Sequence, residues 1–271
     1  HLDIFYNDNG IMRLDTNQIH LIPINPAIVH WVDVDLDGNL DLVTIGADES
    51  QSLMMRVYIN NSNHILIPGI TWQSEIFGVT AGAIAFADYN GDGYDDFAVS
   101  SAGGLFDLTG YGKVEIHSGS STGHITTPSA EWSQTLLQGT FFGYSVDNLG
   151  DVNGDGYADI GFGEPYVDTA GPGSNGAIHV SFGNPNGYSS TFNQSIQGPS
   201  SGSKMGYKIS AAGDIDRDGY DDVWAVRPGS GSSGDLVLFW GSPIEYIPTL
   251  APSACKQVNP INTAPNINVF I

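Results

Sequence analysis

A nine-residue acidic pattern, D-x-[DN]-x-D-G-x-x-D, occurs four times along the chain, starting at Asp33, Asp88, Asp151 and Asp214. In proteins, Ca²⁺ takes about six to eight oxygen ligands. Side chains at positions 1, 3 and 5 can wrap around one ion if the backbone turns sharply between them. Glycine at position 6 permits that turn because it tolerates positive φ. The pattern therefore predicts four calcium sites.

The predicted ligands stand at positions 1, 3, 5, 7 and 9, and position 7 contributes its backbone carbonyl. They are Asp33, Asp35, Asp37, Asn39 and Asp41; Asp88, Asn90, Asp92, Tyr94 and Asp96; Asp151, Asn153, Asp155, Tyr157 and Asp159; and Asp214, Asp216, Asp218, Tyr220 and Asp222. Without a cation, carboxylates crowded into one turn would repel one another. A single copy could be only an acidic, solvated turn, but four copies at regular intervals favour metal sites.

The residues around the loops exclude an EF-hand, which requires Glu at position 12 and flanking helices. Position 12 is occupied by Thr44, Val99, Phe162 and Ala225. Short runs of β-branched and aromatic residues precede and follow the loops, as strands do. We therefore expect each calcium loop to join two strands.

Composition narrows the functional classes. The chain has 271 residues, with 30 acidic and 8 basic side chains and a net charge of −22. Fourteen of the acids occupy loop positions 1, 3, 5 or 9, and four Ca²⁺ ions would bring the net charge to −14. With so few basic residues, the chain does not offer the basic patch that a nucleic acid requires. No apolar run reaches the ~18 residues of a membrane span, and the 35 glycines favour an all-β, turn-rich fold.

The calcium argument favours an extracellular or cell-surface location, whereas the lack of a disulfide would also suit the cytosol. Cys255 is the sole cysteine, so an intrachain disulfide is excluded. Loops of modest affinity would stay empty at cytosolic calcium levels. The chain begins at His1 without a leader sequence, so we expect that any secretion signal has been removed.

The loops define a repeat, because their first aspartates are 55, 63 and 63 residues apart. A period near 60 that holds about four strands suggests propeller blades. We predict four blades within residues 28–246. Residues 1–27 would be the outer strands of an incomplete or closing blade, including a hairpin that turns at Asp8–Gly10, and residues 247–271 a tail or closing strand.

Glycine-containing pairs precede the loops, namely Phe77-Gly78, Phe142-Gly143 and Met205-Gly206, and Gly163-Glu164-Pro165 follows the third loop. In these features residues 28–246 resemble FG-GAP repeats, which build the β-propeller of integrin α subunits and related secreted proteins. The first repeat departs from the pattern, with Pro26-Ala27 in place of Phe-Gly.

The resemblance implies four-stranded antiparallel blades in which the calcium loop joins the innermost strand to the second. It places these loops on a lower face and the ligand on an upper face. The upper face would be built from residues 101–111, 164–175 and 227–234, which include Phe106, Tyr111 and Tyr166.

The blade count departs from the family, because integrin propellers have seven blades and about four and a half are visible here. The last strand could pair with the N-terminal hairpin and close a five-bladed ring. Alternatively, the chain is a piece of a larger propeller, or another chain completes it through exposed strand edges.

Motifs typical of enzymes are absent from the sequence. None of the seven histidines forms an H-E-x-x-H zinc motif, and no G-x-S-x-G nucleophile elbow occurs. A pair of acids for glycoside hydrolysis would have to come from residues outside the loops, such as Glu131, Glu164 and Glu245. We therefore expect a protein without catalytic activity.

The sequence predicts an extracellular, calcium-stabilised β-propeller that acts in adhesion or protein interaction, with about four Ca²⁺ per chain. Its partner would be a protein or a glycan bound opposite the calcium loops, with no nucleic acid and no membrane insertion. A lectin-like propeller and a building block of an extracellular assembly are the alternatives. A lectin would show exposed aromatic rings beside polar groups.

Overall fold

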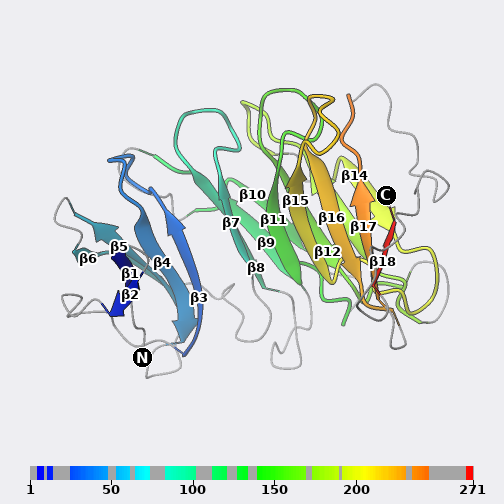
Figure 1. Ribbon diagram of the computed structural model, residues 1–271, viewed down its shortest axis with the longest axis horizontal. Coiled ribbons are helices and arrows are strands. Elements are labelled where there is room, and N and C mark those ends of the chain that lie inside the picture. Colours follow the sequence, from blue (N-terminus) through cyan, green and yellow to red (C-terminus); the bar gives the residue numbers. More distant parts are fainter. Residues whose placement is uncertain are drawn as a thin grey trace.

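The computed structural model describes residues 5–8, 11–14, 25–47, 53–61, 65–73, 83–101, 112–120, 127–133, 139–168, 173–188, 191–229, 234–243 and 267–270. Every regular element within these ranges is a β-strand, and none of them forms a helix that could span a membrane. The strands build four four-stranded sheets and one two-stranded hairpin (Figure 1). The predicted all-β fold is confirmed.

Each four-stranded sheet is one blade, with its strands in chain order. Blade 1 contains β3 (Asn25–Val32), β4 (Asp41–Ala47), β5 (Leu53–Asn60) and β6 (Leu66–Gln73). Blade 2 contains β7 (Ile84–Ala87), β8 (Asp96–Ser101), β9 (Lys113–His117) and β10 (Ala130–Ser133). Blade 3 contains β11 (Ser145–Gly150), β12 (Asp159–Glu164), β13 (Ala177–Ser181) and β14 (Gln194–Gln197). Blade 4 contains β15 (Lys208–Gly213), β16 (Asp222–Arg227), β17 (Gly234–Phe239) and β18 (Ile267–Phe270).

The outer edge of blade 4 differs from the repeat. Blades 1 to 3 are antiparallel throughout, whereas β18 pairs in parallel with β17. The predicted N-terminal hairpin is present as β1 (Phe5–Asp8) and β2 (Ile11–Leu14), which form a sheet of their own. The last strand therefore pairs with blade 4 rather than with the hairpin.

Hydrophobic clusters join successive blades. Val43 and Ile45 of blade 1 pack with Phe97 and Val99 of blade 2 in one cluster of buried residues. A second cluster joins blades 2 and 3, and a third joins blades 3 and 4. A blade between two others is thus covered on both faces, which explains why all six residues of β12 are buried. Burial of apolar surface between sheets is the main stabilising contribution in such a fold.

Close backbone contacts accompany these clusters where the Phe-Gly and Gly-x-Pro segments meet. A Cβ added to Gly163 would overlap the carbonyl oxygen of Gly206 in the next blade. Gly143 and Gly206 both adopt positive φ, at 78° and 84°. Glycine is needed at this junction because any side chain would push two blades apart.

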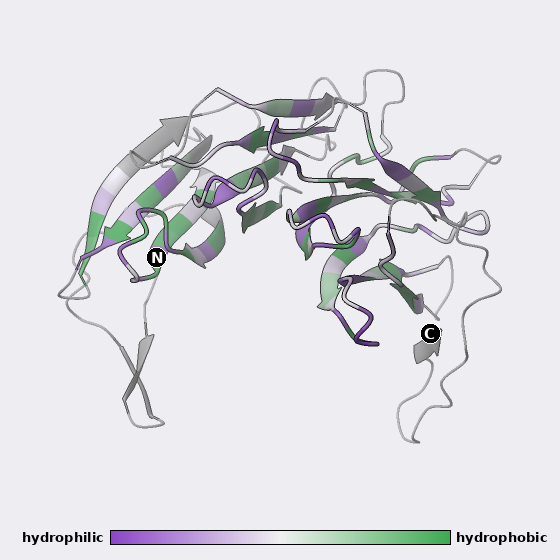
Figure 2. Ribbon diagram, turned by 90° about the horizontal axis from the view of Figure 1, so that it is seen from above, coloured by the Kyte–Doolittle hydropathy of each residue, from purple (hydrophilic) through white to green (hydrophobic). Residues whose placement is uncertain are grey.

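The four blades follow one another along an open arc, with blades 1 and 4 at its two ends (Figure 2). Green, hydrophobic strand segments alternate with purple, hydrophilic loops along that arc. The blades are therefore arranged in space in the same order as in the sequence.

Candidate metal sites

Each acidic loop joins the innermost strand of its blade to the second strand, as predicted. The loop at 33–41 follows β3 and ends at the first residue of β4. The loops at 88–96, 151–159 and 214–222 connect β7 to β8, β11 to β12 and β15 to β16. All four loops therefore lie at the same edge of their sheets, which is at the top in Figure 1 and which we call the lower edge to keep the family's naming.

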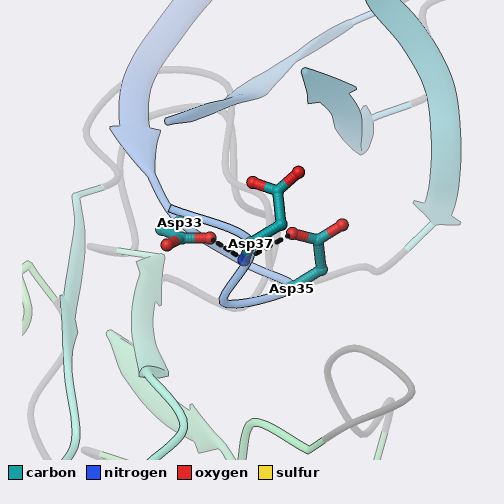
Figure 3. A group of neighbouring side chains, drawn as sticks. All are labelled: Asp33, Asp35 and Asp37. Atoms are coloured by element: carbon teal, nitrogen blue, oxygen red, sulfur yellow. Dashed lines mark hydrogen bonds between the residues drawn. The ribbon is translucent and has the colours of Figure 1, made fainter. Parts of the chain in front are cut away.

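Hydrogen bonds wrap the first loop around the side chain of Asp33 (Figure 3). The Asp33 carboxylate accepts hydrogen bonds from the backbone N–H groups of Asp37, at 3.1 Å, and Gly38, at 2.9 Å. Asp35 accepts a further bond from the N–H of Asp37, at 3.2 Å. These bonds turn the backbone so that three carboxylates come together.

The other three loops repeat this pattern. The position-1 carboxylates of Asp88, Asp151 and Asp214 accept from the N–H groups at positions 5 and 6, at 2.8–3.1 Å. Gly38, Gly93, Gly156 and Gly219 at position 6 have φ between 87° and 96°. The predicted role of the position-6 glycine is confirmed by these angles.

Position 4 also requires positive φ, which the sequence analysis missed. Gly91 and Gly154 occupy it in loops 2 and 3, with φ of 74° and 77°. Leu36 and Arg217 occupy it in loops 1 and 4, with φ of 60° and 65°. Side chains in this region of φ are uncommon and carry strain. A strained turn that gathers acidic groups is typical of a ligand-binding loop.

The donor set fits a hard cation such as Ca²⁺. Asp33, Asp35 and Asp37 place carboxylate oxygens within 4.8 Å of one another, and so do Asp214, Asp216 and Asp218. In loops 2 and 3 the position-3 residue is asparagine, whose amide oxygen is an equally suitable ligand for Ca²⁺. All offered atoms are oxygens, and a divalent cation would neutralise charges that otherwise repel one another.

The position-9 aspartates hold each loop to its blade. Asp159 accepts hydrogen bonds from the backbone N–H of Val152, at 2.9 Å, and of Gly183 beyond β13, at 3.0 Å. The equivalent carboxylates of Asp41, Asp96 and Asp222 make the same two types of bond. An ionised carboxylate has about four lone-pair sites, so each retains acceptor capacity for the predicted cation. Their role in tying the third strand to the loop was not predicted.

Burial shapes the electrostatics of position 9. It raises the pKa of the Asp159 carboxyl to about 8, and the neighbouring Asp155 and Asp151 add to the rise, while two backbone N–H groups oppose it. Burial likewise raises the pKa of Asp96 to about 7. A nearby cation stabilises the ionised form and lowers such a pKa. The buried aspartates therefore gain most from a bound metal.

Neighbouring loops also contact one another. An added Cβ on Gly91 of loop 2 would lie 2.6 Å from Cε1 of Tyr157 in loop 3. The ring of Tyr220 covers Gly154 in the same way. Asp221 accepts a 2.9 Å hydrogen bond from the N–H of Asp151. The tyrosines predicted to contribute carbonyls at position 7 thus also pack against the preceding loop.

We expect Asp155→Ala to reduce the calcium stoichiometry by one ion per chain. Asp155 lies in the turn at position 5, and its Oδ1 accepts a bond from the N–H of Tyr157. Isothermal calorimetry would measure the stoichiometry. Glu131→Ala is the matched control, because Glu131 pairs with Lys113 on blade 2 at 2.8 Å and lies in no loop. Unchanged stoichiometry in Asp155→Ala would refute the ligand assignment.

Of the three glutamates that the sequence offered as candidate acids, the two that the structure describes have structural partners. Glu131 pairs with Lys113, and Glu245 lies outside the described residues. Glu164 Oε2 lies 2.9 Å from His179 Nε2, and Ser195 Oγ lies 2.8 Å from His179 Nδ1. Glu164 is 1% exposed and His179 is 8% exposed, with the ring of Phe192 4.4 Å from the imidazole. We interpret this chain of hydrogen bonds as a polar brace across β12, β13 and β14.

An aromatic cluster occupies the opposite, upper edge of blades 3 and 4. The rings of Phe141 and Tyr166 are 4.9 Å apart, and those of Tyr144 and Tyr207 are also 4.9 Å apart. Lys204 Nζ lies 5.2 Å from the Tyr166 ring, in cation–π geometry. We call these five residues the upper aromatic cluster. Tyr166 is the one upper-face aromatic from the sequence analysis that the structure describes, because Phe106 and Tyr111 lie outside the described residues.

Two members of the upper aromatic cluster have strained backbones. Phe141 and Lys204 have φ of 57° and 53°, in the left-handed region. Both immediately precede the residue pair that corresponds to Phe-Gly, Phe142-Gly143 and Met205-Gly206. The pKa of Tyr144 is raised to about 12, mainly by its side-chain hydrogen bond with Tyr207. Strain of this kind is often concentrated at functional sites.

Comparison with protein families supports the repeat. An FG-GAP-like repeat model matches residues 33–99, and an FG-GAP repeat model matches residues 142–181. The chain contains FG-GAP repeats in these two ranges. The two matches include the acidic loops at 33–41, 88–96 and 151–159. Loop 4 lies outside both, but its hydrogen bonds are those of the other FG-GAP loops.

Integrin α subunits are among the proteins to which this chain is similar. It is 29% identical to integrin alpha-PS2 of Drosophila melanogaster over 236 residues, which are 79% of this chain and 16% of the relative. It is 33% identical to human integrin alpha-6 over 167 residues, or 59% of this chain and 13% of the relative. It is 31% identical to integrin alpha-4 of Xenopus laevis over 148 residues, or 52% of this chain and 14% of the relative. The chain therefore spans less than a fifth of the length of these relatives and has an integrin-α-like propeller.

Proposed function

We propose that this FG-GAP protein is an extracellular, calcium-stabilised propeller module that binds a protein ligand on its upper face. The observation that carries the proposal is the upper aromatic cluster. Tyr144 and Tyr207 immediately precede β11 and β15, and these strands lead to the calcium loops at their other ends. Metal binding and ligand binding would therefore take place at opposite edges of the same blades.

The chemistry of the cluster suits recognition of another protein. Tyrosine is enriched where interfaces concentrate their binding energy. Tyr207 is 38% exposed, although its ring packs on Tyr144. Lys204 places a positive charge over Tyr166 in a chain whose net charge is −22. A ligand with an acidic group next to an apolar or aromatic group would complement this surface.

Calcium would have a structural role in this proposal. The side-chain oxygens of positions 1, 3, 5 and 9 and the carbonyl of position 7 would hold the ion in each loop. The bound ion would fix the turn between the first two strands and neutralise carboxylates, so metal binding would add to the folding free energy. The extracellular location follows from the calcium supply that loops of modest affinity need. Similarity to integrin α subunits supports both points.

A glycan ligand is the second candidate. The upper aromatic cluster combines the exposed ring of Tyr207 with the polar groups of Lys204 and Tyr144, as a lectin surface does. Tyrosine has an apolar ring and a hydroxyl group, so it can contact the apolar and polar parts of a sugar. The two candidates use the same surface and differ in the chemical class of the ligand.

The test is to screen the calcium-loaded chain against a panel of purified extracellular-matrix proteins and against a glycan array. We expect a protein ligand whose affinity falls about 30-fold in Tyr207→Ala, since truncation of a central interface tyrosine costs about 2 kcal/mol. Ile67→Ala is the control, because Ile67 is 48% exposed on blade 1. Glycan hits alone would favour the second candidate. Ligands that Tyr207→Ala binds normally would exclude the upper aromatic cluster as the site.

A further inference from the structure

The acidic loops of blades 3 and 4 are joined by direct contacts. The strands that lead into them, β11 and β15, lie side by side (Figure 1). The N–H of Asp151 donates a 2.9 Å hydrogen bond to Oδ2 of Asp221, and the N–H of Asp221 donates a 3.0 Å bond back to the carbonyl oxygen of Asp151. Asp221 therefore holds both backbone polar groups of the first predicted ligand in loop 3.

Further contacts from blade 4 surround this pair. The N–H of Ser242, beyond β17, donates a 3.0 Å hydrogen bond to the carbonyl oxygen of Val152 in loop 3. Gly150, directly before Asp151, has φ of 78°, and a Cβ added to it would overlap Oδ2 of Asp221. Glycine at position 150 therefore leaves the space in which the Asp221 carboxylate reaches loop 3.

Asp221 is itself part of loop 4. It stands at position 8, between Tyr220 and Asp222, which are predicted to supply the position-7 carbonyl and the position-9 carboxylate. Asp222 is 1% exposed and accepts hydrogen bonds from the N–H groups of Ile215 and Gly241, at 2.9 and 3.0 Å. An ion in loop 4 would fix the backbone on both sides of Asp221. The order of loop 4 would thereby reach Asp151 in loop 3.

The boundary between loops 2 and 3 is built differently. Position 8 of loop 3 is Ala158, whose side chain has no acceptor for the N–H of Asp88. A Cβ added to Gly91 would still lie 2.6 Å from the ring of Tyr157, so the two loops do pack together. Packing between loops is therefore common to both boundaries, whereas a carboxylate that holds the first ligand of the preceding loop distinguishes the boundary between loops 3 and 4.

We propose that Asp221 positions the calcium site of loop 3 from the neighbouring blade, so that loops 3 and 4 bind calcium cooperatively. This inference rests on the calcium sites of the proposed function. Two coupled sites change each other's affinity by the same factor. Residues that orient a metal ligand typically change metal affinity by about 10–100-fold, and coupling between two sites is typically about 5–150-fold. We therefore expect a coupling of about 10-fold.

A calcium titration that resolves the two loops tests this coupling. The N–H groups of Gly156 and Gly219 donate to the first carboxylates of loops 3 and 4, at 2.8 and 3.0 Å. Their NMR signals in the full chain labelled with ¹⁵N-glycine would report each site separately. The double variant Asp216→Ala/Asp218→Ala empties loop 4 and leaves Asp221 in place. The calcium affinity of loop 3 should fall about 10-fold in this variant.

Substitutions of Asp221 test its role without removing a predicted ligand. Asp221→Ala should keep the native calcium stoichiometry but lower the affinity of loop 3 about 10-fold. Asp221→Asn keeps an oxygen acceptor for the N–H of Asp151 and should restore most of that affinity, which a simple charge effect would not allow. Asp235→Ala is the matched control, because Asp235 pairs with Arg227 at 2.7 Å outside the loops, and it should leave loop 3 unchanged.

Combining the variants gives the sharpest result. In the Asp221→Ala background, emptying loop 4 should have little further effect on loop 3, as in a double-mutant cycle. Unchanged affinity of loop 3 after loop 4 is emptied would overturn the cooperativity, and equal coupling with and without Asp221 would overturn the role of this residue. Either result would leave the calcium sites of the proposed function intact, whereas a chain that binds no calcium would refute both. Circular dichroism would verify that the variants remain folded.

Discussion

Removal of calcium is expected to lower the melting temperature of the chain by at least about 10 °C. A ligand that binds only the folded state adds about 2.7 kcal/mol at a concentration of 100 times its Kd. For a chain of this size, each kcal/mol shifts the melting temperature by about 2–4 °C. Four occupied loops therefore give an effect much larger than that of a typical surface substitution.

The physical reason lies in the position of the acidic groups. Asp33, Asp35 and Asp37 meet within one turn, and Asp41 behind them is buried at 0% exposure. Without the ion, burial and neighbouring carboxylates would destabilise the ionised forms. The loops also connect the two innermost strands of each blade, so their loss of order would be transmitted directly to the core between blades.

Melting curves by circular dichroism, with excess Ca²⁺ and with excess chelator, would measure this effect. A sample in chelator with about 1 M NaCl separates ligation from charge screening, because salt screens carboxylates over about 3 Å but does not bridge them. We expect salt to restore only a small part of the lost stability. Equal melting temperatures in calcium and in chelator would show that the loops are acidic turns without a structural metal.

The loops could be predicted from sequence because their chemistry is local. Ligand positions, the position-6 glycine and the strand on either side all fall within 18 to 23 consecutive residues. The blades could also be predicted, because the loop recurs with a regular period. The backbone of Asp155 and Gly156, for example, has the hydrogen bond and the positive φ that the pattern requires.

Features that depend on contacts between blades could not be predicted in the same way. The upper aromatic cluster brings Tyr144 next to Tyr207, and this contact depends on how two blades pack. Asp159, at the start of β12, accepts one of its two hydrogen bonds from Gly183, which lies beyond β13. The parallel pairing of β18 with β17 depends on a connection that carries no calcium loop. A repeat pattern describes one unit and contains little information about its neighbours.

Gly163→Ala is expected to destabilise the chain by about 3 kcal/mol, at the upper end of the range for overpacked cores. The added methyl group would overlap the carbonyl oxygen of Gly206 in blade 4. That oxygen belongs to the backbone, so the clash cannot be relieved by a side-chain rotation. Gly206 itself has φ of 84°, and a Cβ added to it would overlap the carbonyl oxygen of Ala177. The two blades would have to separate, and the apolar cluster between them would lose part of its packing.

Chemical denaturation in calcium would measure the change in unfolding free energy. Gly187→Ala is the control, because Gly187 has φ of 82° but no atom within 4 Å of an added Cβ. Its cost is therefore that of backbone strain alone, about 1 kcal/mol. Calcium stoichiometry should be unchanged in both variants, since neither residue lies in an acidic loop. If Gly163→Ala is no more destabilising than Gly187→Ala, close backbone contact between blades is not what requires glycine at the Gly-x-Pro segment.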